Sequence, residues 1–210
     1  MSTSTWNRLT VGEPVHTKDG LMGGRIWDGP VSALQAHNHR VFAPTLADES
    51  ISSLTGNIGQ ICTLIRENDL EDIILVGHSY GGMVITGVAD RMPERIRRLV
   101  YLDAAVPDPG QSLYDILNLG FSSTTGSRPG LPEPARPYVE KLQYDPEKTA
   151  RVPKTYILCT KSEFAAVTSI ARDKIAAGKK GWTYLELPSS HVPMADMPDR
   201  FNRLLLDAAG

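Results

Sequence analysis

The chain is 210 residues long and 41% hydrophobic, which suits one globular domain with a sizeable core and excludes a disordered or collagen-like chain. Lys and Arg total 22 against 24 Asp and Glu, so the net charge is −2 and the basic surplus of a nucleic-acid binder is missing. No apolar run approaches the roughly 18 residues of a membrane-spanning helix, and the N-terminal segment has no signal-peptide core. We therefore expect neither a nucleic-acid nor a membrane partner.

Two cysteines, Cys62 and Cys159, lie far apart in the sequence, each in an apolar context (GQICTLI and YILCT). This pattern predicts buried, reduced thiols rather than a disulfide. Reduced cysteines are typical of cytoplasmic proteins, so we expect a cytoplasmic location.

Short apolar runs alternate along the chain with longer segments of helical periodicity. The run 72–76 (DIILV) is apolar at each position after its Asp, as expected of a strand covered on both faces. The alternation predicts an α/β fold with a mostly parallel sheet of about six strands and helices on both faces. The predicted strands are 40–43, 72–76, 99–102, 155–158 and 182–187, and the predicted helices are 51–66, 81–91, 164–177 and 200–209.

Residues 107–153 break this rhythm, because they hold eight of the fifteen prolines in the chain. Proline at this density ends helices and is incompatible with central strands. An insertion of this length in a compact domain is usually a lid or a binding loop. Since it also carries apolar side chains such as Leu117, Phe121 and Tyr138, we expect a cap within a single domain spanning residues 1–210.

A buried strand, a glycine-rich turn and an amphipathic helix follow one another in residues 72–84 (DIILVGHSYGGMV). This is the context in which a G-x-S-x-G motif forms a nucleophile turn, with a strained serine held at the carboxyl end of the sheet. We therefore predict Ser79 as a nucleophile. The backbone N–H of Tyr80, at the start of the helix, is the predicted donor to the oxyanion that forms on attack.

A serine hydroxyl needs a base, and the candidate base is His191. It follows the last predicted strand in a loop before the C-terminal helix, so it emerges at the same sheet edge as Ser79. His78, beside the serine, is predicted to point elsewhere and to be structural.

The acid that orients the base has two candidates. Asp103 ends the strand LVYL, and Glu163 follows the next strand, TYIL. Either carboxylate lies after Ser79 in the chain and near the carboxyl end of a strand, as the order serine, acid, histidine requires. We favour Asp103, with Glu163 as the alternative.

These motifs resemble the α/β-hydrolase superfamily, and most closely its branch of small bacterial esterases, plant methyl esterases and hydroxynitrile lyases. The resemblance implies a Ser–His–acid triad with neither a metal nor an organic cofactor. It also implies an acid directly after the strand TYIL, where this chain has Ser162; other members place the acid after the preceding strand, where Asp103 stands. The matching pieces are GGRIWDG, HRVFAPTL, LVGHSYGGMVITGVADR, RIRRLVYLDAAVPDPGQS, TYILCT and His191.

The second oxyanion donor of this branch is the backbone N–H that follows a His-Gly pair after the first core strand. The resemblance therefore implies the Leu21 N–H, although Asp19 stands where histidine is usual. The preceding strand corresponds to residues 11–18 (VGEPVHTK), whose glutamate, proline and lysine predict an atypical strand. A first strand exposed at the sheet edge would offer a surface for a homodimer.

Together these features predict a serine hydrolase that cleaves a small apolar carboxylic ester, lactone or thioester through an acyl-enzyme. One alternative is a ligand-binding protein of this fold without catalysis. Another is a carbon–carbon lyase, which is disfavoured because Val192 stands where the lyases of this branch have a lysine.

Overall fold

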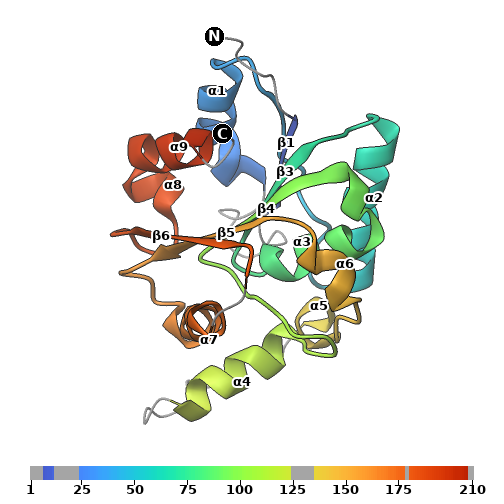
Figure 1. Ribbon diagram of the computed structural model, residues 1–210, viewed down its shortest axis with the longest axis vertical. Coiled ribbons are helices and arrows are strands. Elements are labelled where there is room, and N and C mark those ends of the chain that lie inside the picture. The colour runs from blue at the N-terminus through green and yellow to red at the C-terminus, as the bar shows by residue number, and fades with distance from the viewer. Residues whose placement is uncertain (1–6, 12–23, 124–134, 178–179, 208–210) are drawn as a thin grey trace.

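The computed structural model describes residues 7–11, 24–123, 135–177 and 180–207. The strands it describes form a six-stranded parallel sheet in the order β2-β1-β3-β4-β5-β6 (Figure 1). The α/β class predicted from the alternation of elements is confirmed. The strands are β1 (Asn7–Val11), β2 (Arg40–Phe42), β3 (Ile73–His78), β4 (Ile96–Leu102), β5 (Lys154–Cys159) and β6 (Trp182–Leu187).

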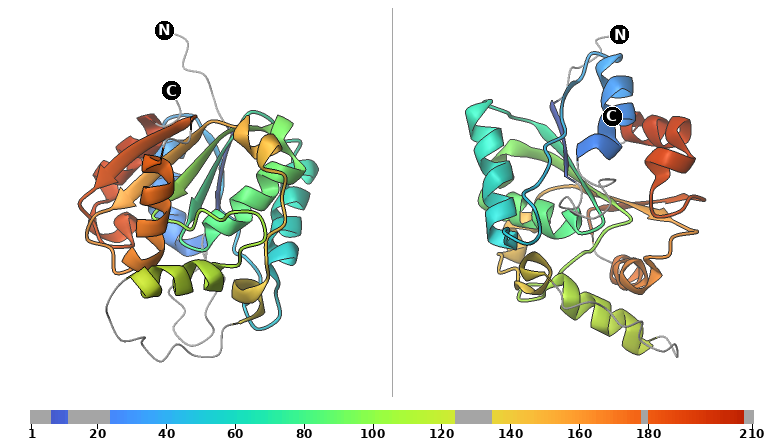
Figure 2. Two further views of the ribbon diagram at one scale, coloured as in Figure 1. Left: turned by 60° about the horizontal axis from the view of Figure 1, so that its bottom comes forward. Right: turned by 180° about the vertical axis from the view of Figure 1, so that it is seen from behind.

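Helices cover both faces of the sheet (Figure 2). Side chains from alternate strand positions form one apolar cluster with the helices on the first face. The side chains of the other positions form a second cluster with the helices on the opposite face. Among the described residues, no helix has the length and apolar character needed to cross a membrane. The first face carries α1 (Asp28–Gln35), α8 (Pro193–Asp196) and α9 (Pro198–Asp207), and the second carries α2 (Leu54–Glu67), α3 (Gly81–Arg91) and α7 (Ala165–Ala176).

Helix α2 begins three residues later than the periodicity predicts. Ser53 is its N-cap, and the serine side chain accepts a hydrogen bond from the Gly56 N–H. Ile51, which the sequence places on the buried helix face, therefore lies before the helix and is 82% exposed. The predicted start was wrong because the helix begins after the capping serine, although the apolar spacing extends further towards the N-terminus.

The N-terminal strand also differs from the prediction. Strand β1 is Asn7–Val11 rather than residues 11–18, and it lies between β2 and β3 rather than at an exposed edge. Its register pairs Val11 with Gly77, so the chain leaves β1 beside the end of β3. The atypical residues that suggested a poor strand follow β1 instead, and residues 12–23 lie outside the described ranges.

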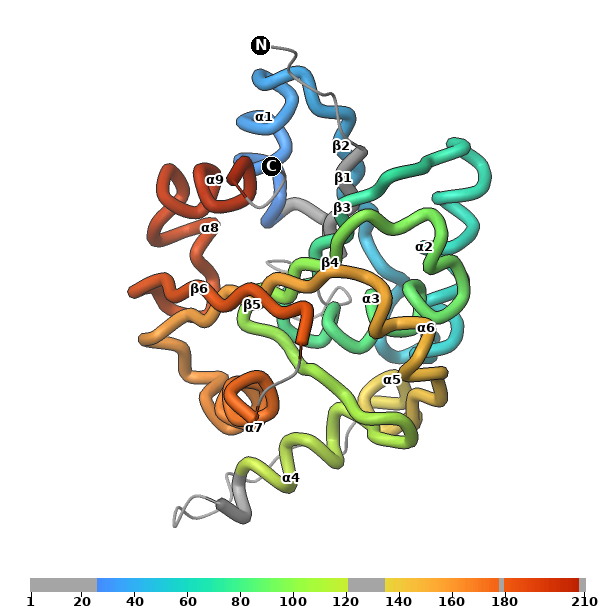
Figure 3. The backbone as a smooth tube through the Cα atoms, viewed as in Figure 1, coloured from blue at the N-terminus to red at the C-terminus, as the bar shows by residue number. Residues whose placement is uncertain are grey.

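The described part of the segment 107–153 contains three helices on the side of the sheet that carries α2, α3 and α7 (Figure 3). They are α4 (Leu113–Ser123), α5 (Arg136–Val139) and α6 (Pro146–Ala150). Helix α4 starts at a capping box. The Ser112 hydroxyl accepts from the Asp115 N–H, and the Asp115 carboxylate accepts from the Ser112 N–H. Proline density in this segment thus interrupts helices without preventing them.

Candidate active site

The turn after β3 holds Ser79 in a left-handed backbone conformation, with a φ of 55°. The turn needs glycine on both sides. A Cβ at Gly77 would lie 2.6 Å from the Gly81 carbonyl oxygen, and a Cβ at Gly82 would lie 2.1 Å from the Ala105 carbonyl oxygen. The close approach of strand and helix therefore fixes this strained turn.

Asp103 occupies the equivalent position after β4, the neighbouring strand. Its φ is 44°, and both Asp103 and Ser79 are 0% exposed. The two turns are joined through the backbone, because the Ser79 N–H donates to the Leu102 carbonyl at 3.2 Å and the Ala105 N–H donates to the Ser79 carbonyl at 3.1 Å. The structure thus brings these two predicted residues to one edge of the sheet.

The imidazole of His191 lies against the Asp103 carboxylate, with 2.7 Å between Nδ1 and Oδ2. The other carboxylate oxygen accepts the Cys159 N–H at 3.0 Å, so both oxygens of Asp103 are held. Glu163, the alternative acid, is exposed and precedes α7. Ser162, at the usual acid position of the branch, has its hydroxyl oxygen 3.5 Å from His191 Nδ1.

Hydrogen bonds from two different segments hold the loop that carries His191. The Lys161 N–H, after β5, donates to the Ser189 carbonyl at 3.0 Å. On the other side, His78 Nε2 lies 2.7 Å from the His191 carbonyl oxygen, and the two imidazole rings are 4.5 Å apart. The sequence predicted a structural His78 that points elsewhere. The residue is buried, and its contact with the His191 loop joins residues 113 positions apart, so no local signal in the sequence indicates this contact.

Tyr80 follows Ser79 directly and is the N-cap residue of α3, and the first N–H groups of a helix have no acceptor within it. Its side chain is buried, and its hydroxyl accepts from the Asn57 amide at 3.2 Å. Burial raises the pKa of the Tyr80 phenol, so the ring stays neutral at physiological pH. Leu21, the second predicted oxyanion donor, lies outside the described residues.

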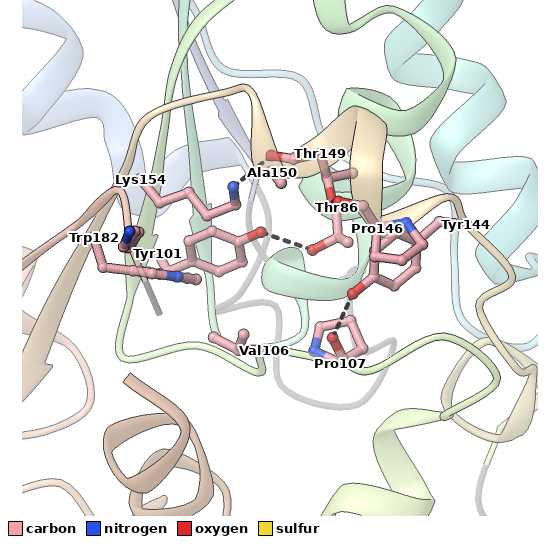
Figure 4. A pocket seen from close by; sticks show the side chains of 11 residues that line it. Thr86, Tyr101, Val106, Pro107, Tyr144, Pro146, Thr149, Ala150, Lys154 and Trp182 are labelled. Carbon is pink, nitrogen blue, oxygen red and sulfur yellow. Dashed lines mark hydrogen bonds between the residues drawn. The ribbon is translucent and has the colours of Figure 1, made fainter. Parts of the chain in front are cut away.

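A cavity of about 360 Å³ lies on the α3 side of the sheet (Figure 4). Neither Ser79, His191 nor Asp103 lines it. The Thr86 hydroxyl donates to the Gly82 carbonyl and pairs with the Tyr101 hydroxyl at 2.8 Å, so these groups are committed within the chain. The lining residues are Thr86, Tyr101, Val106, Pro107, Tyr144, Pro146, Thr149, Ala150, Lys154, Lys180 and Trp182.

The described residues do not include a candidate metal site. Among them, His, Cys, Asp and Glu side chains form no group of three that would hold a metal ion.

Residues 15–150 match the model of the "Alpha/beta hydrolase family". The chain belongs to the α/β hydrolase family. This α/β hydrolase is 31% identical to a carbendazim hydrolyzing esterase from Nocardioides sp. (strain SG-4G), over 84% of this chain and 91% of that protein. It is 30% identical to methylesterase 8 from Arabidopsis thaliana, over 56% of this chain and 46% of the relative.

Solved structures show the same fold. An extracellular alpha/beta-hydrolase from a Paenibacillus species aligns with a TM-score of 0.76 at 23% identity, over 97% of this α/β hydrolase and 98% of that chain.

Proposed function

We propose that Ser79, His191 and Asp103 are the nucleophile, base and acid of a serine esterase. The observation that carries this proposal is the 2.7 Å contact between His191 Nδ1 and Asp103 Oδ2, at the sheet edge where the strained turn holds Ser79. Membership of the α/β hydrolase family and the esterase relatives support hydrolysis of a carboxylic ester. They favour neither ligand binding without catalysis nor carbon–carbon cleavage.

In the acylation step, the Ser79 oxygen attacks the ester carbonyl carbon while His191 Nε2 takes the hydroxyl proton. Because Nδ1 of His191 faces the Asp103 carboxylate, Nε2 is the nitrogen left for this transfer. Asp103 stabilises the imidazolium that forms. The tetrahedral intermediate collapses when His191 returns the proton to the alkoxide, and the alcohol leaves.

In the deacylation step, water takes the place of the alcohol. His191 removes a proton from the water as its oxygen attacks the acyl carbon, and the Ser79 oxygen leaves with that proton. The products are the carboxylic acid and the free enzyme, so the cycle needs no cofactor.

The negative oxygen of both intermediates requires hydrogen-bond donors. The Tyr80 N–H at the start of α3 supplies one of them. The Leu21 N–H supplies the second. Support comes from β1, since Val11 pairs with Gly77 and the chain therefore leaves the sheet beside the nucleophile turn.

The segment 107–153 forms a cap over the substrate. Tyr138 in this segment packs edge-on against the Tyr80 ring, with 5.1 Å between centroids, so the segment reaches the residue that follows the nucleophile. Its apolar and aromatic composition favours a small apolar acyl or alcohol group, in an ester, a lactone or a thioester.

The decisive experiment compares wild type with S79A on p-nitrophenyl acetate and butyrate. Wild type should hydrolyse both esters, and a fluorophosphonate probe should label wild type but not S79A. Equal rates for the two proteins, with no labelling of wild type, would refute the esterase proposal.

A cytoplasmic location is part of the same proposal. Cys62 and Cys159 are free and buried, and they belong to apolar clusters on opposite faces of the sheet, so no disulfide joins them. The balanced charge favours a small-molecule substrate over nucleic acid. The homodimer prediction rested on an exposed first strand; β1 lies inside the sheet, so that ground is lost, and light scattering tests the oligomeric state.

A further inference from the structure

We propose that His78 is a positioning residue that fixes the backbone of the base, His191, relative to the nucleophile turn. This inference rests on the proposed function, because it assigns His78 a role in holding His191 at the correct position relative to Ser79. His78 directly precedes Ser79 in the chain, so one dipeptide supplies both the nucleophile and an anchor for the base.

The anchor is a hydrogen bond between a side chain and the backbone. His78 Nε2 lies 2.7 Å from the His191 carbonyl oxygen. A carbonyl oxygen only accepts hydrogen bonds, so Nε2 carries the proton and donates it. The neutral ring with its proton on Nε2 satisfies this bond without placing a charge at a residue that is 0% exposed.

Packing leaves the His78 ring little freedom. Its centroid lies 4.5 Å from the centroid of the His191 ring. The centroid of the Trp27 ring lies 6.5 Å away, with the two ring planes at 83° to each other. Trp27 is itself 0% exposed and belongs to the core between the sheet and α1. The donor that holds His191 is thus supported by the core of the domain rather than by a loop.

Asp103 and His78 control different parts of the base. Asp103 Oδ2 contacts the imidazole at Nδ1 and so orients the ring. His78 contacts the main chain of His191 and so fixes the position of the backbone that carries the imidazole. Since a displacement of about 1 Å in a catalytic group can cost about 10²-fold in rate, the second contact matters for turnover.

The test replaces His78 by Phe, Gln and Asn. Phe keeps a ring but removes the donor and leaves the His191 carbonyl without it. Gln is the conservative variant, because its amide nitrogen stands as many bonds from the backbone as His Nε2, whereas the Asn amide nitrogen stands one bond closer. We expect kcat on p-nitrophenyl acetate to fall by roughly 10- to 100-fold in H78F and H78N with little change in KM, and to recover in H78Q.

Val76→Ala is the matched control, because Val76 lies on the same strand and the same sheet face as His78 and belongs to the apolar cluster that contains Trp27. The exchange removes buried volume but removes no hydrogen bond to the His191 loop, because a valine side chain makes none. The melting temperature of this variant should fall while its kcat stays near that of wild type. This outcome separates lost stability from lost positioning.

A second measurement asks whether His78 acts through His191. In a His191→Ala background, H78F should cost no further activity, because the base it positions is gone. The proposal is overturned if H78F keeps kcat within about threefold of wild type, if H78Q is as impaired as H78N, or if H78F is equally harmful without His191. Should H78F fail to fold, the comparison of H78Q with H78N decides. Each of these outcomes is distinct from failure of the esterase proposal, in which S79A equals wild type.

Discussion

The Asp103 carboxylate and the His191 imidazole meet at 2.7 Å, although 88 positions separate them in the chain. The carboxylate comes from the end of β4, whereas Ser162, after β5, presents only a hydroxyl at 3.5 Å from the same nitrogen. Both strand ends reach one imidazole nitrogen because β4 and β5 are neighbours in the sheet. We therefore expect that a carboxylate placed after either strand could face this nitrogen.

Asp103→Asn should lower kcat by about 10⁴-fold, the loss that the same exchange causes in chymotrypsin-type serine proteases. Asparagine tolerates the left-handed backbone better than most residues, so the turn with its φ of 44° should persist. Steady-state kinetics together with a melting curve checks this. Glu163→Gln is the matched control and should keep its turnover, since Glu163 is exposed; the reverse pattern would make Glu163 the acid.

Adding Ser162→Asp to Asp103→Asn should restore part of the lost activity. The new carboxylate would start from a position whose hydroxyl oxygen is 3.5 Å from His191 Nδ1. We expect the double variant to exceed Asp103→Asn by at least about tenfold in kcat. If Ser162→Asp adds nothing, position 162 does not reach the imidazole productively.

Leu21→Pro should lower kcat by roughly 10²- to 10³-fold, because proline has no N–H to donate to the oxyanion. Leu21→Ala keeps the N–H and should therefore keep kcat near the wild-type value. Equal activities in the two variants, both folded, would show that another group supplies the second donor.

Gly120→Ala should displace α4 from α7, since a Cβ at this position would lie 1.8 Å from the Ala166 carbonyl oxygen. We expect the free energy of unfolding to fall by about 1–3 kcal/mol. If residues 107–153 cap the substrate, KM for p-nitrophenyl butyrate should rise as well. Gly29→Ala, in α1, is the control, because its Cβ would meet nothing within 4 Å; it should change neither quantity appreciably.

The two cysteines should resist thiol reagents in the folded protein at about pH 8 and react after unfolding. Burial, followed by the charge of Asp103, raises the pKa of the Cys159 thiol to about 12 from an ordinary value of 9.0. The unfolded thiol therefore ionises first as pH rises, so this contribution to stability is complete below pH 9.0 and is lost towards pH 12. Urea titrations at about pH 8 and about pH 10 should show a steeper decline for wild type than for Cys159→Ala.

The sequence predicts the nucleophile turn well because its signals are local. The apolar run of β3, the glycines and the helix that follows are contiguous, and each feature requires the same turn. Helix α4 also had a local signal, the capping box from Ser112 to Asp115, but the surrounding prolines outweighed it in the prediction.

Features set by distant contacts were harder to predict. Strand β1 (NRLTV) has no continuous apolar run, and its interior place follows from pairing with β2 and β3. The two candidate acids, Asp103 and Glu163, follow consecutive strands, β4 and β5. Only the packed sheet shows which carboxylate meets His191. The contact of His78 with the His191 loop likewise exists only after β3 and β6 have joined the same sheet.

The turns that follow β3 and β4 interlock through the contact of Ala105 with Ser79 and the tight space at Gly82. For protein engineering, this divides the molecule into a part to conserve and a part to diversify. Randomising residues 77–82 or 103–105 would mostly yield inactive clones. If residues 107–153 cap the substrate, a library at the exposed positions of this segment should vary substrate preference while leaving the two turns unchanged.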